Sequence, residues 1–318
     1  MDRNPFSGLG TALITPFKED GSVDSEALAK IVEKQLAEGV DFFCVLGTTA
    51  ETPCLTTDEK RHIMQLVKEL VGGRRPLLLG AGGNCTAQVV EYLKKEDLTG
   101  YDGVLIVVPY YNKPTQEGIY QHFKAVAENS PLPVVLYNVP GRTGVNMTAE
   151  TTLRLAHDFK KIVGIKEASG NLEQATQIIK ECPAHFNVIC GDDALTFDMI
   201  SNGAKGVISV LGNIYTAEFG EMVHILQKSA QFTDRINIQS DLKELLLAKK
   251  LHQSFKDMYS LLFKDGNPAG IKYVMNQYHL CRNILRLPLV PVSHQTEDLL
   301  NAGIKDLQTK GFQVGNGE

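Results

Sequence analysis

The chain has 318 residues, of which 43% are hydrophobic and 22% are charged, and its formal net charge is −5. This is the composition of a globular protein large enough to bury a substantial core without disulfides or metals. The acidic balance, together with the lack of a long run of Lys and Arg, argues against nucleic acid or an anionic membrane as a partner. No apolar run of about 18 residues predicts a membrane span.

The cysteines and histidines indicate the compartment and argue against a metal site. None of the six cysteines forms a C-x-x-C pair, and Cys44 and Cys190 lie inside apolar runs, which is typical of reduced, buried thiols in a cytoplasmic protein. We find no basic segment followed by an apolar one at the N-terminus, so no secretory signal is expected. The eight histidines show no H-x-H or H-E-x-x-H spacing, so a histidine-based metal site is not expected.

Short apolar runs alternate with helical patterns along the first part of the chain. Asp24 can cap the first helix, and Thr56 with Glu59 forms a capping box before the second. Nearly all the apolar runs are continuous, which predicts parallel strands buried on both faces. The eight predicted strands are residues 9–14, 42–46, 76–79, 103–108, 133–137, 162–166, 187–190 and 206–210.

Eight strand–helix units of this kind predict an α/β fold, a (β/α)8 TIM barrel, whose usual size is about 250 residues. The alternative, an open doubly wound sheet, would need a phosphate-binding loop after the first strand, and Thr15-Pro16-Phe17 is not one. From about residue 234 the alternation stops and leucines recur at helical spacing. We therefore predict a catalytic barrel over residues 1–230 and an all-helical C-terminal extension over residues 231–318.

Lys166 stands at the end of the sixth predicted strand, where TIM barrels place their functional side chains. Burial of a lysine lowers its pKa, and the free amine can attack a ketone to form a Schiff base. A lysine whose ammonium reaches solvent from the strand end is the alternative. Polar or small residues end or follow the other strands and could relay protons or bind a carboxylate. They are Thr48, Thr49, Tyr110, Tyr111, Tyr137, Arg142 and Gly191, with Ile208 inside the eighth strand.

Five motifs at these strand ends resemble the dihydrodipicolinate synthase / N-acetylneuraminate lyase family of pyruvate-dependent class I aldolases. The resemblance extends from about Pro5 to about Leu300. It rests on residues 47–51 (GTTAE), 110–115 (YYNKPT), 137–144 (YNVPGRTG), 164–170 (GIKEASG) and 191–193 (GDD).

The resemblance implies a role for each catalytic candidate. Lys166 is similar to the lysine that captures pyruvate as a Schiff base, and Tyr137 to the proton donor and acceptor beside it. Thr48, Thr49 and Tyr111 are similar to the other members of a proton relay, and Thr49 also to a contact of the pyruvate carboxylate. In the family the tyrosine matching Tyr111 reaches the neighbouring subunit's site, which implies a homo-oligomer, usually a tetramer built as a dimer of dimers. The covalent lysine–pyruvate link implies that no separate cofactor is needed.

The remaining site candidates bear on the substrate. Gly191 and Ile208 are expected to contact pyruvate, Ile208 through its backbone. Arg142 matches the arginine that holds the second substrate's carboxylate in the synthase branch of the family. The favoured reaction is therefore condensation of pyruvate with L-aspartate 4-semialdehyde, toward diaminopimelate and lysine.

Two other hypotheses for the function stay open. An aldolase could cleave N-acetylneuraminate or a keto-deoxy sugar acid with the same lysine, although such members generally lack the Arg-Thr-Gly ending. A binding protein on a barrel scaffold is the third, because fold alone does not define function. A binder would gain nothing from a lysine surrounded by relay hydroxyls.

The sequence departs from the family pattern at two positions. Ala50 stands where the family usually has glycine. Gln88 stands where members inhibited by lysine have a glutamate, and a neutral amide cannot pair with the effector's ammonium group. We therefore predict weak or absent feedback inhibition by lysine.

Overall fold

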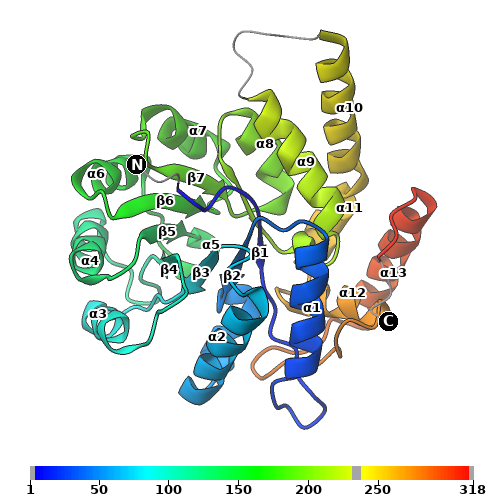
Figure 1. Cartoon of the computed structure of the whole chain (residues 1–318), viewed down its shortest axis with the longest axis horizontal. Coiled ribbons are helices and arrows are strands. Elements are labelled where there is room, and N and C mark those ends of the chain that lie inside the picture. Colours follow the sequence, from blue (N-terminus) through cyan, green and yellow to red (C-terminus); the bar gives the residue numbers. More distant parts are fainter. Residues whose placement is uncertain (1–3, 231–237, 315–318) are drawn as a thin grey trace.

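The computed structural model describes residues 4–230 and 238–314, without the side chains of residues 238–241. Eight parallel strands pair in sequence order, and β8 pairs with β1 to close a barrel (Figure 1). The predicted (β/α)8 barrel is confirmed. The strands are β1 (Gly8–Ala12), β2 (Phe42–Val45), β3 (Leu77–Gly80), β4 (Gly103–Val107), β5 (Val134–Asn138), β6 (Ile162–Glu167), β7 (Asn187–Cys190) and β8 (Gly206–Ser209).

Helices follow the strands and form the outer layer of the barrel (Figure 1). Both predicted N-terminal caps are confirmed: Asp24 accepts from the Ala27 N–H, and Thr56 and Glu59 form the capping box. These helices are α1 (Ser25–Ala37), α2 (Thr57–Val71), α3 (Thr86–Lys95), α4 (Gln116–Asn129), the short α5 (Pro140–Thr143), α6 (Ala149–Asp158), α7 (Leu172–Glu181), α8 (Thr196–Ser201) and α9 (Thr216–Ser229).

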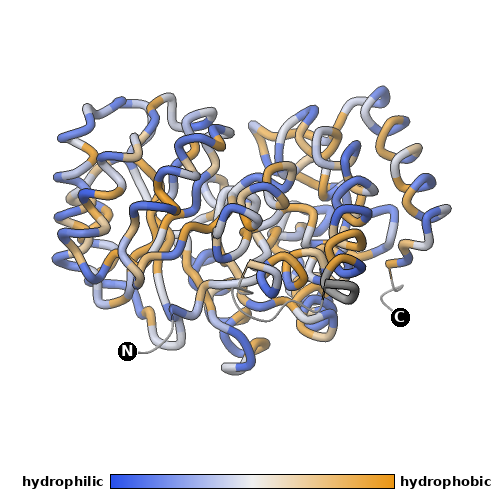
Figure 2. The backbone as a smooth tube through the Cα atoms, turned by 90° about the horizontal axis from the view of Figure 1, so that it is seen from above, coloured by the Kyte–Doolittle hydropathy of each residue, from blue (hydrophilic) through white to orange (hydrophobic). Residues whose placement is uncertain are grey.

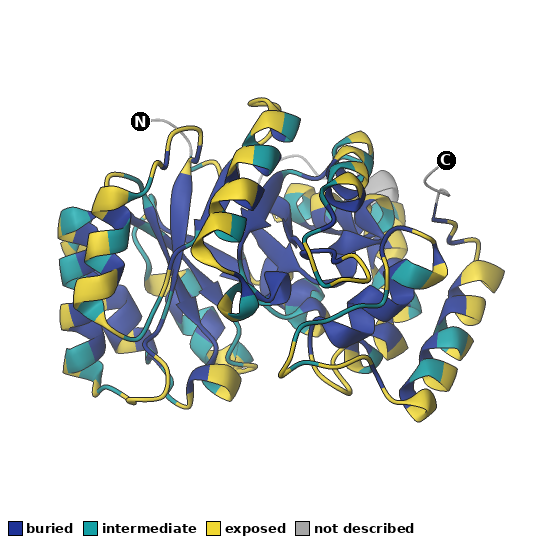
Figure 3. Ribbon diagram, turned by 90° about the horizontal axis from the view of Figure 1, so that it is seen from below, coloured by how far each residue is buried: buried dark blue, intermediate teal, exposed yellow. Residues whose placement is uncertain are grey.

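The strands are buried on both faces, as continuous apolar runs predict (Figure 3). Outward-facing side chains pack under the helices, and the apolar residues gather along this layer (Figure 2). Inward-facing side chains form a separate cluster inside the barrel, including Phe42, Cys44, Val135, Tyr137 and Ile208. The lumen is therefore a packed core, open to chemistry only at its ends.

The C-terminal extension is helical over its described residues and gathers on one flank of the barrel (Figure 1). Its helices are α10 (Ile238–Ser254), α11 (Lys256–Leu261), α12 (Ala269–Gln277) and α13 (His294–Thr309). An aromatic cluster joins it to the barrel: the Phe255 ring packs 5.3 Å from that of Tyr215 and 6.2 Å from that of Phe219. The division at residue 230 stays a prediction, because residues 231–237 lie outside the described ranges.

None of the helices that the structure describes has the length and apolar character needed to span a membrane.

Candidate active site

Lys166 and Tyr137 lie side by side at the ends of neighbouring strands. They are register partners of β6 and β5. Each is only 7% exposed, and the lysine Nζ lies 4.5 Å from the centre of the tyrosine ring. Lys166 is therefore not a lysine that reaches solvent. An amine and a phenol meet inside the mouth of the barrel.

The remaining surroundings of the Lys166 side chain are small or apolar. A Cβ atom at Gly191 would come within 3.0 Å of the lysine Cγ and Cε atoms, so only glycine leaves room for this side chain. Ile208 belongs to the buried cluster inside the barrel. Cys44 lies there too, and burial raises the pKa of its thiol, opposed by the charge of Lys166.

The next residue of each strand points the opposite way and fixes the two strand ends. Asn138 donates from Nδ2 to a Glu167 carboxylate oxygen at 3.0 Å, and the Ser169 N–H donates to the other oxygen at 2.7 Å. Asn138 and Glu167 are register partners, as Tyr137 and Lys166 are. Sequence reasoning missed this pair, although matching polar residues directly after Tyr137 and Lys166 were a readable signal.

Thr48 and Thr49 form a short 3-10 turn, η1 (Thr48–Ala50), after β2. Thr48 is half-buried, whereas Thr49 is only 3% exposed. The Thr49 Oγ1 accepts a hydrogen bond of 3.0 Å from Nδ2 of Asn267, which precedes α12 in the C-terminal extension. The extension therefore contributes a side chain directly to the candidate site, which sequence reasoning missed.

A buried ion pair lies next to this contact. Lys272 on α12 and Glu51, directly after η1, are both fully buried, with Nζ and Oε1 2.5 Å apart. Burial lowers the pKa of Lys272, and the neighbouring Glu51 carboxylate opposes that shift. The second Glu51 oxygen accepts from the Arg286 backbone N–H at 2.9 Å. Both oxygens of the carboxylate thus bind the C-terminal extension.

Two candidates lie at the surface of the single chain. Tyr111 is 89% exposed, and its φ of 72° is unusual for a residue with a Cβ. Arg142 is exposed on α5, just beyond Tyr137. Neither side chain joins the buried group around Lys166.

The acidic pair after β7 is structural. Asp192 accepts from the Ala194 N–H at 2.9 Å and caps η3 (Asp193–Leu195). Asp193 is buried and accepts from the backbone N–H groups of Val210 and Leu211 at 3.1 and 2.8 Å. Burial raises the pKa of Asp193 to about 6. Across residues 4–230 and 238–314, no group of three or more His, Cys, Asp or Glu side chains could hold a metal ion.

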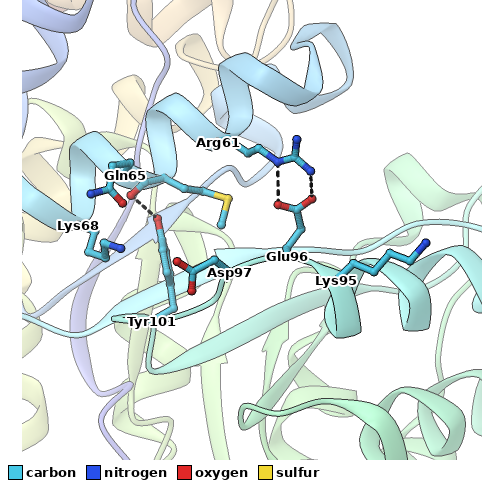
Figure 4. A pocket seen from close by; sticks show the side chains of 8 residues that line it. Arg61, Gln65, Lys68, Lys95, Glu96, Asp97 and Tyr101 are labelled. Carbon is cyan, nitrogen blue, oxygen red and sulfur yellow. Dashed lines mark hydrogen bonds and ion pairs between the residues drawn. The ribbon is translucent and has the colours of Figure 1, made fainter.

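A hollow lies on the outer surface, between α2 and the end of α3 (Figure 4). Three of its charged groups are paired: Arg61 donates to both oxygens of Glu96, and Lys95 pairs with Glu91. The Tyr101 hydroxyl donates to a backbone carbonyl. This hollow brings together no nucleophile and base, and it is not the candidate site. It is lined by Arg61, Met64, Gln65, Lys68, Lys95, Glu96, Asp97 and Tyr101.

Comparison with known proteins gives the class to which this fold and site belong. Residues 5–307 match the dihydrodipicolinate synthetase family, and the chain belongs to that family. A 4-hydroxy-tetrahydrodipicolinate synthase of Phocaeicola vulgatus is 56% identical over 98% of this chain and 100% of its own length. The 4-hydroxy-tetrahydrodipicolinate synthase of Parabacteroides distasonis is 54% identical over 96% of this chain and 98% of its own length. A crystal structure of dihydrodipicolinate synthase from Thermotoga maritima superposes with a TM-score of 0.87 at 38% identity, covering 95% of this chain and 98% of that one.

Proposed function

We propose that this protein condenses pyruvate with L-aspartate 4-semialdehyde to give 4-hydroxy-tetrahydrodipicolinate. The observation that carries the proposal is the buried amine of Lys166, 4.5 Å from the Tyr137 ring at the mouth of the barrel. Relatives that match this chain over nearly its whole length are named for the same reaction, which favours condensation over cleavage of a sugar acid.

The chemistry begins at the Lys166 amine. Its nitrogen attacks C2 of pyruvate, and loss of water gives the imine. A proton then leaves the methyl carbon, and the resulting enamine attacks the aldehyde carbon of the second substrate. The new alkoxide takes a proton. The substrate's own amino group displaces the lysine from the imine, which closes the ring and returns the free amine.

Each of these steps moves a proton, and the site supplies hydroxyl groups for that purpose. Tyr137 is proposed as the donor and acceptor closest to the reacting carbon, with Thr48, Thr49 and Tyr111 passing protons to and from it. The low exposure of Tyr137 and Thr49 supports this role, because buried hydroxyls exchange protons with each other rather than with bulk water. No cofactor is required in this scheme, since the lysine itself forms the covalent link.

Three further residues are proposed to bind the substrates. Gly191 packs against the Lys166 side chain, and it is proposed to contact the bound pyruvate. The Ile208 backbone, at the end of β8, would contact the pyruvate carboxylate. The exposed guanidinium of Arg142 can form two parallel hydrogen bonds to the carboxylate of the aldehyde substrate.

Tyr111 also supports a proposal about assembly. A tyrosine that is 89% exposed beside the site cannot act in a relay within one chain, whereas a second copy could receive it. We propose a homotetramer built as a dimer of dimers, working in the cytoplasm.

Weak or absent inhibition by lysine remains a prediction, and titration of the condensation rate with lysine tests it.

The first experiment measures the initial rate of condensation with both substrates, for the unchanged protein and for Lys166→Ala. Lys205→Ala is the matched control, because Lys205 is an exposed lysine at the opposite end of the barrel. A fast rate that only Lys166→Ala abolishes supports the proposal. Borohydride trapping of pyruvate on Lys166 without condensation would contradict the proposed aldehyde but not the Schiff base. Absence of both would contradict the proposed function.

A further inference from the structure

The Thr49 hydroxyl is held by a residue from the other end of the chain. Asn267 and Thr49 are separated by 218 positions, and both are buried, at 6% and 3% exposure. The distance of 3.0 Å between Nδ2 and Oγ1 is that of an ordinary hydrogen bond. Asn267 does not contact Lys166 by any hydrogen bond or ion pair in the described part of the chain.

The direction of this hydrogen bond constrains the threonine. A hydroxyl group has one proton to donate and lone pairs that can accept. Because the Asn267 amide donates to Oγ1, the threonine proton must point toward a different acceptor. In this orientation the Asn267 Oδ1 is buried with no hydrogen-bond partner among the described residues. The reverse amide orientation would place Oδ1 against the hydroxyl, where it would accept the threonine proton. With the amide donating, the Thr49 proton is left for a group other than Asn267.

The same two segments are joined a second time nearby. Glu51 follows Thr49 by two positions and Lys272 follows Asn267 by five, and these two form the fully buried ion pair. The Lys272 Nζ also donates to the Ile284 carbonyl at 2.9 Å. Glu51 itself adopts a φ of 54°, a conformation that a residue with a Cβ keeps only where its surroundings enforce it. The ion pair thus holds together the two chain segments that carry Thr49 and Asn267.

We propose that Asn267 is a positioning residue of the catalytic relay, and that it orients the Thr49 hydroxyl as a proton donor. This inference rests on the proposed function and adds a residue of the C-terminal extension to it. Asn267 acts through Thr49 alone. Its effect should therefore depend on the Thr49 hydroxyl.

A double-mutant cycle tests this dependence. Asn267→Ala should lower kcat by about 10- to 100-fold, with a smaller change in the KM for pyruvate, because misplacing one relay group costs rate rather than binding. In a Thr49→Val background the same substitution should change kcat by less than about twofold. In a Thr49→Ser background, which keeps the hydroxyl, the loss should return. Equal losses in all three backgrounds would overturn the proposal.

Asn267→Asp tests the direction of the hydrogen bond. The side chain keeps its shape, but a carboxylate can only accept, so it would draw the Thr49 proton away from the relay. The expected kcat is as low as that of Asn267→Ala or lower. A variant with nearly full activity would show that Thr49 donates to position 267, and the proposed polarity would be wrong.

Asn276→Ala is the matched control in the same extension. Its Nδ2 holds the Cys281 carbonyl at 3.0 Å and does not touch Thr49. It should lower the melting temperature without coupling to Thr49→Val. Thermal unfolding of each variant separates a loss of folded protein from a loss of rate.

Borohydride trapping with pyruvate alone separates the proposed function from the proposed positioning role. Failure to trap pyruvate in the unchanged protein contradicts the function. Trapping without coupling between Asn267 and Thr49 contradicts only the positioning role.

Discussion

Two buried lysines, one at the barrel mouth and one at the junction with the extension, show how surroundings decide what an amine does. Lys272 is fully buried, pairs with the Glu51 carboxylate and donates to the Ile284 carbonyl. Lys166 is also buried, but its neighbour is the face of the Tyr137 ring. A paired ammonium keeps its proton and holds segments together. Lys166 has no carboxylate partner among the described residues, and its amine lies where it can attack a ketone at the barrel mouth.

The largest expected effect follows from removing the reactive lysine at the barrel mouth. Lys166→Ala should lower the condensation rate by at least about 10⁴-fold, because no other group can form the imine. Stability should change little, since no carboxylate depends on this lysine for its charge. Steady-state kinetics and thermal unfolding measure the two quantities. Substantial remaining activity would mean that another amine captures pyruvate.

The second largest effect follows from removing the paired lysine at the junction between the barrel and the extension. Lys272→Met should lower the free energy of unfolding by about 3–5 kcal/mol, because the Glu51 carboxylate would stay buried without its partner. Urea unfolding measures this change, and borohydride trapping on Lys166 should persist in the folded protein. Adding Glu51→Gln should recover part of the loss. A Lys272→Met protein of unchanged stability would contradict a structural role for the pair.

A third prediction concerns how the stability of the protein depends on pH, through an ion pair between α2 and the C-terminal extension. The Arg286 guanidinium donates to Glu59 and lowers the pKa of this carboxyl from 4.5 to about 2. Because the folded-state pKa is the lower one, the stabilisation is complete above about pH 4.5 and is lost as the pH falls toward 2. Allowing for solvent screening, we expect a loss of about 2 kcal/mol. Glu59→Gln keeps the capping-box geometry and should flatten the stability curve in that window; an unchanged curve would argue against the pairing.

The smallest effect concerns space beside the reactive lysine. In Gly191→Ala, the new methyl group would lie 2.7 Å from the Ala168 Cβ and 3.0 Å from the Lys166 Cγ and Cε atoms, so this strand end and the lysine side chain must shift. We expect a fall of about tenfold in the rate of pyruvate trapping, with little change in melting temperature. Gly141→Ala is the control, since no atom lies within 4 Å of a Cβ at that exposed position. A trapping rate equal to that of the control would mean that the lysine has more freedom than its surroundings indicate.

Much of the architecture and several site residues could be predicted from local patterns. Continuous apolar runs indicated parallel strands buried on both faces, and eight of them indicated closure into a barrel. Lys166 and Tyr137 could be placed at the mouth because each ends such a run. Asp24 and Thr56 could be assigned as helix caps because capping depends on residues three positions apart.

The sequence by itself therefore determined the elements, their order and which side chains end the strands, because these depend on short-range spacing. Only the tertiary structure decided the contacts between Thr49 and Asn267 and between Glu51 and Lys272, which join positions 218 and 221 residues apart. No periodicity links residues so distant, and the partner of a buried polar group is set by packing. The helical extension could be predicted from its leucine pattern, but its contribution to the candidate site emerges only where α12 meets the barrel.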